Sequence, residues 1–176
     1  DYINGTVAKH IVTIEDPVEF IFSNKKSIVS QRQLLIDTPS FSDGVKYALR
    51  QDPDVILVGE IRDEETASAA VQAAMTGHQV YSSLHTNDAF SAIPRLLQIG
   101  VQPFLLSCAL IAIIAQRLAR TICPYCKYEY PITEEERRII AKVLGEERAN
   151  EIKHLFRGRG CEKCKGKGYT KRIAIC

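Results

Sequence analysis

The chain has 176 residues, of which 45% are hydrophobic and 25% charged, and its formal net charge is +2. This composition is typical of a globular protein, and so small a net charge provides no argument for a nucleic-acid or membrane partner. The longest apolar run, Leu105 to Ala115 with one serine in it, is too short to span a bilayer.

The N-terminal part of the chain is expected to contain one buried strand. Residues 1–10 are polar and predict a helix end or a loop. The apolar run His10–Ile14 then predicts a strand that leads into an acidic turn at Pro17. Residues 20–36 alternate loosely between polar and apolar side chains, which predicts a short extended hairpin.

A helix and a second buried strand are expected next. Ser40 or Ser42 is suited to be the N-cap of a helix that runs to about Gln51, where Asp52-Pro53 ends it. Val55–Val58 is a run of four apolar residues, three of them β-branched, and predicts a strand buried in a parallel sheet. The run ends at Gly59 and places Glu60 at the carboxyl end of the strand.

The next segment predicts a β-α-β unit. Asp63 opens an acidic first turn, which suits the dipole of a helix that runs to Met75 with Gly77 as its stop. A third apolar strand, Gln79–Leu84, follows and ends in His85. The crossover between the two strands should be right-handed.

Two helices are expected before residue 120. Asn87 or Asp88 is expected to cap the first, which reaches Ile99 and stops at Gly100. Pro103 is suited to the first turn of the second, which is apolar nearly all round as far as Ala119. We therefore expect this second helix, with Cys108, to be buried.

Polar side chains follow three of the predicted strands at the same end. These are Glu15, Asp16 and Glu19 after the first strand, Glu60 after the second and His85 after the third. Ligands of open α/β sheets bind at the carboxyl ends of the strands, and phosphoryl transfer needs acids that position magnesium and water. Together they favour nucleotide hydrolysis. Taken singly, each residue also has a structural explanation, as a loop acid, a turn cap or a hydrogen-bonded histidine.

The composition changes near Thr121, which predicts two parts, residues 1–120 and 121–176. The second part contains a charged helix from Thr133 to about Leu144 that starts with a capping box. The tail Arg157–Arg172 has seven Lys or Arg and one acid. This tail is either a nucleic-acid patch or, as we favour, a solvated or partner-facing surface.

Four cysteines form two C-x-x-C units, Cys123 with Cys126 and Cys161 with Cys164. Two such units predict a tetrahedral Zn²⁺ site with four thiolate ligands, and a site without an open coordination position is structural. The alternative is four unrelated thiols.

Three stretches resemble, in order, the conserved boxes of the secretion ATPase superfamily. Thr13–Phe20 resembles the aspartate box, Arg50–Asp63 the Walker B region and Thr76–Asn87 the histidine box. The tetracysteine unit narrows the resemblance to the type II secretion and type IV pilus assembly ATPases (GspE/PilB type), because the pilus-retraction ATPases lack it. Leu35 stands where that family commonly carries glycine.

The resemblance implies a RecA-like P-loop NTPase core of mostly parallel strands, incomplete at its N-terminus, with a small zinc subdomain. It implies that Glu19 activates water, that Glu60 acts through Mg²⁺ and that His85 lies near the phosphates of ATP. Other nucleotide contacts are implied for Glu15, Asp16, Arg62 and His78. Because His78 precedes its strand, geometry alone would place it at the opposite edge of the sheet.

The function implied is that of a homo-hexameric ATPase for type II secretion or type IV pilus assembly. It would be cytoplasmic, at the inner face of a bacterial inner membrane, and would contact a platform protein there. Rival interpretations are a nucleic-acid translocase and a zinc-ribbon module on a non-catalytic domain. The phosphate-loop motif G-x-x-x-x-G-K-[S/T] does not occur in the sequence. We therefore expect the chain to be a fragment that is inactive by itself.

Overall fold

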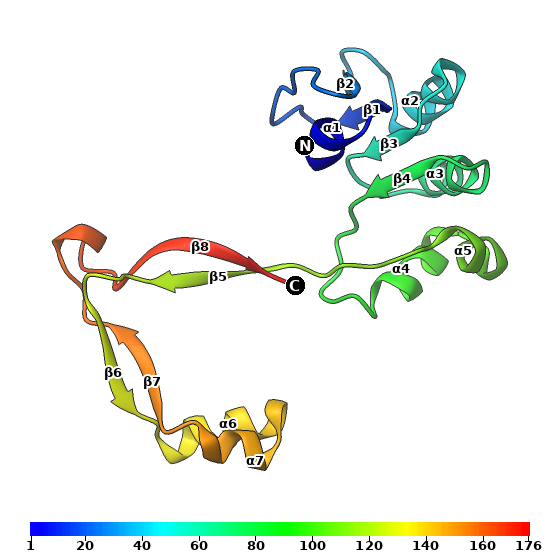
Figure 1. The fold of residues 1–176 in the computed structure, drawn as a ribbon. Helices are drawn as coiled ribbons and strands as arrows, with labels where there is room; N and C mark the ends of the chain where they lie inside the picture. The colour runs from blue at the N-terminus through cyan, green and yellow to red at the C-terminus, as the bar shows by residue number, and fades with distance from the viewer. The chain divides into compact units, whose positions relative to one another are not determined.

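The computed structural model describes residues 1–176. The chain forms two compact units, residues 1–115 and 116–176 (Figure 1), and we describe each by itself. The boundary that the sequence suggests, near Thr121, falls inside strand β5 (Arg117–Ile122) of the second unit. None of the helices combines the length and the hydropathy needed to cross a membrane.

The first unit is built on one four-stranded sheet. Its strand order is β2-β1-β3-β4, and every neighbouring pair is parallel. The predicted parallel sheet is therefore confirmed. The strands are β1 (His10–Glu15), β2 (Ile28–Gln33), β3 (Val55–Val58) and β4 (Gln79–Ser82).

Helices pack on this sheet, and side-chain caps define two of their starts. The Ser40 side chain accepts a hydrogen bond from the backbone N–H of Asp43, and the Asp63 side chain accepts one from Thr66. Ser40 is thus the N-cap. The helices of this unit are α1 (Tyr2–Thr6), α2 (Phe41–Ala48), the 3₁₀ turn η1 (Leu49–Gln51), α3 (Glu64–Met75), α4 (Ala92–Ile99) and α5 (Pro103–Ala109).

Two apolar clusters stabilise the unit. The larger joins the sheet to α2 and α3, and its buried members include Val12, Ile14, Ile56, Val45 and Ala73. Burial along β1 and β3 is nearly continuous, with Val12–Ile14 buried in β1 and three of the four residues buried in β3, as expected for parallel strands covered on both faces. The smaller cluster joins α3 to α4 and α5 through Ala67, Leu96, Val101 and Leu106.

The predicted hairpin over residues 20–36 is wrong. Only β2 forms there, and it pairs in parallel with β1. The segment between the two strands is held by side-chain amides instead of a partner strand. The Gln31 and Gln33 side chains accept hydrogen bonds from the N–H groups of Phe22 and Val18, and Asn4 accepts one from Lys25.

Two helix bounds also differ from the prediction. The helix expected from Asn87 or Asp88 starts at Ala92, and its N-cap is Ser91, whose N–H donates to the Asp88 carboxylate. Helix α5 ends at Ala109, ten residues earlier than expected, and Cys108 is exposed instead of buried. β-Branched residues favour extended backbone: Ile111 and Ile114, which are 95% and 77% exposed, lie in the extended segment that leads to β5.

The second unit consists of two antiparallel ribbons and a helical pair. Strand β5 pairs with β8 (Tyr169–Ile175), and β6 (Lys127–Pro131) pairs with β7 (His154–Gly158). Helices α6 (Glu134–Leu144) and α7 (Glu146–Glu151) connect β6 to β7, and the 3₁₀ turn η2 (Glu162–Cys164) precedes β8 (Figure 1). The capping box predicted at Thr133 is present, with Glu136 as its second member.

Candidate active site and metal centre

The carboxyl ends of β1, β3 and β4 lie at one edge of the sheet. Parallel pairing sets Ile14 beside Val58, and Val58 beside Ser82. The residues that follow these strands therefore emerge at neighbouring points. Glu60 and His85, which come from different strands, meet there as the sequence predicts.

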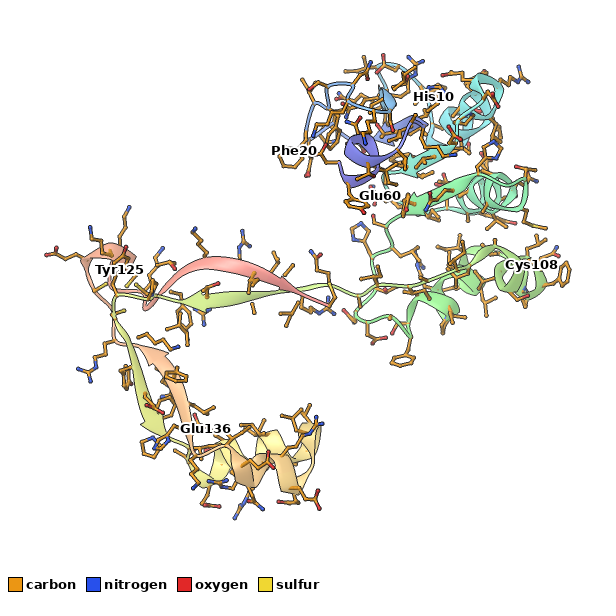
Figure 2. All side chains as sticks on the ribbon, viewed as in Figure 1. His10, Phe20, Glu60, Cys108, Tyr125 and Glu136 are labelled. Atoms are coloured by element: carbon orange, nitrogen blue, oxygen red, sulfur yellow. The ribbon has the colours of Figure 1, made fainter.

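Glu60 is the carboxylate around which this edge is organised (Figure 2). Its Oε2 lies 2.5 Å from Arg62 Nε and 2.9 Å from His85 Nε2. The Glu60 side chain is 12% exposed, whereas the side chains of Arg62 and His85 are 66% and 79% exposed. The hydrogen bond from Arg62, and then that from His85, lowers the pKa of Glu60 although burial opposes this shift. Glu60 is therefore held as a carboxylate beside two cationic or polar groups that solvent and ligands can reach.

The acids that follow β1 have different surroundings. Glu15 Oε1 accepts hydrogen bonds from Thr13 Oγ1 at 2.6 Å and Gln31 Nε2 at 3.0 Å, which fixes its side chain. Glu19 is exposed, and no hydrogen bond or ion pair joins it to Glu60. The structure thus brings His85 and Arg62 to Glu60 but does not bring Glu19 there.

His78 lies at the amino end of β4, which is the opposite end of that strand from His85. Its Nδ1 is 3.0 Å from the carbonyl oxygen of Ala73 and 3.1 Å from Thr76 Oγ1. These contacts connect the end of α3 to the start of β4. They place His78 where the order of the chain predicts it.

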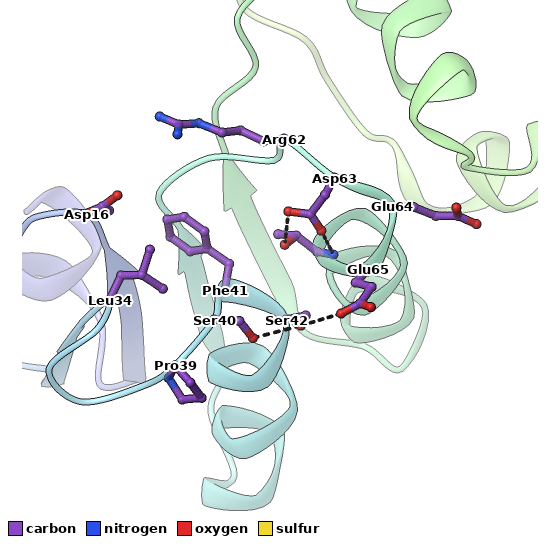
Figure 3. A pocket seen from close by; sticks show the side chains of 11 residues that line it. Asp16, Leu34, Pro39, Ser40, Phe41, Ser42, Arg62, Asp63, Glu64 and Glu65 are labelled. Carbon is purple, nitrogen blue, oxygen red and sulfur yellow. Dashed lines mark hydrogen bonds between the residues drawn. The ribbon is translucent and has the colours of Figure 1, made fainter.

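An acidic groove of about 530 Å³ opens at the same edge, beside the starts of α2 and α3 (Figure 3). Two of the predicted site residues, Asp16 and Arg62, line it. The Asp63 carboxylate is occupied by the N–H and hydroxyl of Thr66, and Ser42 Oγ lies 3.5 Å from Glu65. Sequence patterns did not indicate Ser42 and Glu65 as site residues, because a helix-start pattern does not show what lies opposite it.

The four predicted cysteines come together in the second unit. Their sulfur atoms all lie within 4.8 Å of one another. The Cys123–Cys161, Cys126–Cys164 and Cys161–Cys164 sulfur pairs are 3.9, 3.9 and 3.8 Å apart. A tetrahedron with Zn–S bonds of about 2.3 Å has edges of about 3.8 Å. The spacing of the four sulfur atoms therefore fits a Zn²⁺ ion with four thiolate ligands.

Backbone N–H groups donate to one sulfur of this cysteine cluster and favour its thiolate form, which is the form that binds a metal ion. The N–H groups of Cys161 and Gly168 lie 3.1 and 3.2 Å from Cys164 Sγ. They lower the pKa of the Cys164 thiol to about 6, whereas burial raises that of Cys126 to about 12. One sulfur thus carries negative charge readily, and another depends on a cation to lose its proton.

Comparison with known protein families shows the family of this chain. The family model described as "Type II/IV secretion system protein" matches residues 1–176. The chain belongs to the type II/IV secretion system protein family. This membership confirms the resemblance on which the three boxes and the tetracysteine unit agree.

Curated relatives in this family have names that specify secretion and pilus assembly. Type II secretion system protein E of Aeromonas hydrophila is 46% identical over 168 residues, which are 95% of this chain and 32% of that protein. Type II secretion system ATPase E of Vibrio cholerae is 45% identical over 169 residues, again 95% of this chain and 32% of that protein. Type IV pilus assembly ATPase PilB of Thermus thermophilus is 47% identical over 177 residues, 97% of this chain and 19% of that protein.

Solved structures in the family agree on the fold. The pilus retraction motor PilT with bound ADP matches with a TM-score of 0.66 and 50% identity, over 70% of this chain and 38% of that one. The Legionella pneumophila ATPase DotB matches with a TM-score of 0.53 and 30% identity, over 81% and 42%. The chain spans about a third of the length of the type II secretion relatives.

Proposed function

We propose that this chain is part of a motor that hydrolyses ATP to drive type II protein secretion or type IV pilus assembly. The arrangement of Glu60, Arg62 and His85 at one strand edge supports this proposal most directly. Several relatives in the same family are named as ATPases of these two systems.

The geometry of Glu60 suits the transition-state role that we assign to it. Both of its contacts use Oε2, so Oε1 is free to accept a hydrogen bond from a water molecule. Bound ATP with Mg²⁺ would supply the γ-phosphoryl group and the cation that neutralises its charge. Glu60 would orient the water ligands of Mg²⁺, while His85 and Arg62 are exposed enough to turn towards the phosphates.

Other residues have supporting roles in this proposal. Glu19, exposed and unpaired, would activate the attacking water once a nucleotide is bound. Glu15, Asp16 and His78 would complete the nucleotide site directly or through the loops that carry them. The cysteine cluster would hold a structural Zn²⁺ in the part that we assign to residues 121–176, and the partial ATPase core would be residues 1–120.

The proposed site needs a phosphate-binding loop in addition to the residues of this chain. No G-x-x-x-x-G-K-[S/T] motif occurs here, and β4 is an edge strand with one unpaired side. A further strand that carries the loop would satisfy this edge and protect it from aggregation. We propose that such a strand pairs with β4, next to the loop that carries His85.

The assembly proposed is a homo-hexamer that contacts a platform protein at the cytoplasmic face of the inner membrane. This assignment rests on the family to which the chain belongs, and no nucleic-acid partner is proposed for the motor.

The test is Glu60→Gln in the full-length protein. Loss of the carboxylate charge should lower kcat at least about a hundredfold while the Kd for ATP changes little, because Glu60 acts in the transition state. Glu135→Gln makes the same chemical change at an exposed position on α6 and serves as the control. A Glu60→Gln variant that turns over ATP at the rate of the control would refute the assignment.

A further inference from the structure

Two arginines face each other across the ribbon of the second unit. Arg120 of β5 and Arg172 of β8 are direct partners in the antiparallel register. Like charges directly opposite in a strand pair destabilise it. Neither arginine forms an ion pair with a carboxylate in the structure. The fold thus places two cations together and leaves their charge uncompensated.

Two other arginines of this unit are paired with acids. Arg157 Nη2 lies 3.0 Å from Glu136 Oε1, and Arg137 Nε lies 3.8 Å from Glu134 Oε1. Arg120 and Arg172 have no such partner at the place where they face each other across the ribbon.

A groove of about 400 Å³ lies over this arginine pair, and we call it the basic groove. No acid lines it. Its lining residues are Arg120, Lys167, Tyr169, Thr170, Lys171 and Arg172. The Arg120 guanidinium lies 4.1 Å from the centre of the Tyr169 ring, which restricts its position over the groove. Among residues 116–176, fifteen Lys and Arg stand against eight Asp and Glu, so the surroundings add to the positive potential.

We propose that the basic groove binds a phosphate group, and that Arg120 and Arg172 grip it from opposite strands. A guanidinium presents paired N–H donors that match phosphate oxygens. Two guanidinium groups carry two positive charges, so they match a phosphate dianion better than they match one carboxylate. The Thr170 hydroxyl offers another donor within the same lining, and Lys167 and Lys171 add charge. A bound phosphate would remove the repulsion between the arginines, so it would stabilise the ribbon that binds it.

The volume indicates what carries the phosphate. Ligand pockets usually enclose about 300–1,000 Å³, so this groove has room for more than one phosphate group. Two sources share this chemistry, a soluble molecule with a di- or polyphosphate and the headgroup of an anionic phospholipid. The inference concerns the second unit alone and does not depend on hydrolysis at Glu60.

The first experiment uses the full chain with zinc present and titrates it with inorganic pyrophosphate in a calorimeter at low salt. Charge-assisted hydrogen bonds are stronger than neutral ones, so Arg120→Gln and Arg172→Gln should each weaken binding at least about tenfold. Arg172→Lys keeps the charge but loses the paired donors, and should fall between wild type and Arg172→Gln. Lys142→Gln, an equal charge change at an exposed position on α6, should stay within about twofold of wild type.

The second experiment measures sedimentation of the same proteins with vesicles of phosphatidylglycerol and phosphatidylcholine, or of phosphatidylcholine alone. Binding to the anionic vesicles that both glutamine variants lose would identify a lipid headgroup as the source. Arginine-dependent pyrophosphate binding without vesicle binding would identify a soluble ligand.

Stability provides an independent check that the variants are folded. Removing one of two facing cations should keep or raise the melting temperature, and pyrophosphate should raise that of wild type more than that of Arg172→Gln. Glu60→Gln should bind pyrophosphate at the basic groove as wild type does. The proposal is refuted if neither probe binds or if both arginine variants bind as wild type does.

Discussion

Leu35 adopts a backbone conformation that suits glycine. Its φ is +63°, and its side chain is 81% exposed. The left-handed region costs a residue with a Cβ atom about 1–2 kcal/mol, and no packing of the leucine offsets this cost here. A glycine, which the family resemblance leads us to expect here, would suit this turn between β2 and α2, where the Leu35 N–H donates to the carbonyl of Thr38.

We predict that Leu35→Gly raises the free energy of unfolding by about 0.5–1 kcal/mol, because the relief of strain exceeds the entropy that glycine adds to the unfolded chain. Urea denaturation followed by circular dichroism measures the change. Ile36→Gly is the control: it is 74% exposed and lacks the positive φ, so the same substitution there should destabilise. Equal effects at the two positions would contradict the explanation.

The end of β7 packs against the residue that precedes β8, and this contact supports the cysteine cluster. A Cβ atom on Gly158 would lie 2.1 Å from the carbonyl oxygen of Gly168. That carbonyl accepts from the Cys123 N–H at 2.9 Å, and the Gly168 N–H donates to Cys164 Sγ at 3.2 Å. The close approach of two glycines therefore positions two of the four sulfur ligands.

We predict that the purified protein contains about one zinc per chain, and that Gly158→Ala weakens zinc binding at least about tenfold. Displacement of a group that orients metal ligands typically has an effect of this size. Competition with a chromophoric chelator gives the affinity. Gly5→Ala is the control, because a Cβ atom there has nothing within 4 Å. Unchanged zinc affinity in Gly158→Ala would show that Gly168 does not position the cysteines.

At the scale of the whole molecule, the nucleotide site that we propose needs groups that hold phosphates, and the sequence contains no phosphate-loop motif to supply them. Glu60 presents a negative charge at the strand edge, and the acidic groove at that edge is lined by Asp16, Asp63, Glu64 and Glu65. Carboxylates without a bound cation repel ATP, and no backbone nest or P-loop lysine compensates for them.

We therefore predict that residues 1–176 by themselves neither bind ATP tightly nor hydrolyse it, although the zinc site is filled. Calorimetry with ATP and Mg²⁺ on this chain measures binding. NMR then shows which residues are perturbed. Micromolar binding that perturbs Glu60 and His85 would show that the phosphate site is formed by residues in this chain. Binding that perturbs only Arg120 and Arg172 would instead be the phosphate binding inferred for the basic groove.

Local patterns were enough to predict much of this protein. The β-branched run at Val55–Val58 predicted a strand buried on both faces, and the order of strands and helices predicted that Glu60 and His85 meet. The two C-x-x-C units predicted the cysteine cluster. These features depend on residues close together in the chain and on the common direction of parallel strands. The sequence shows both, through the spacing of its motifs and the order of its strands and helices.

Features that depend on distant partners were decided only by the tertiary structure. The apolar residues after Ala109 are compatible with a buried helix and with an extended segment. Several of them are β-branched isoleucines, which favour extended backbone, and the helix ends before them. Arg120 and Arg172 are far apart in the chain, and their repulsion appears only when β5 and β8 pair in register. Pairing across such a separation is selected by the packing of the whole unit, because no local spacing specifies which residues will face each other.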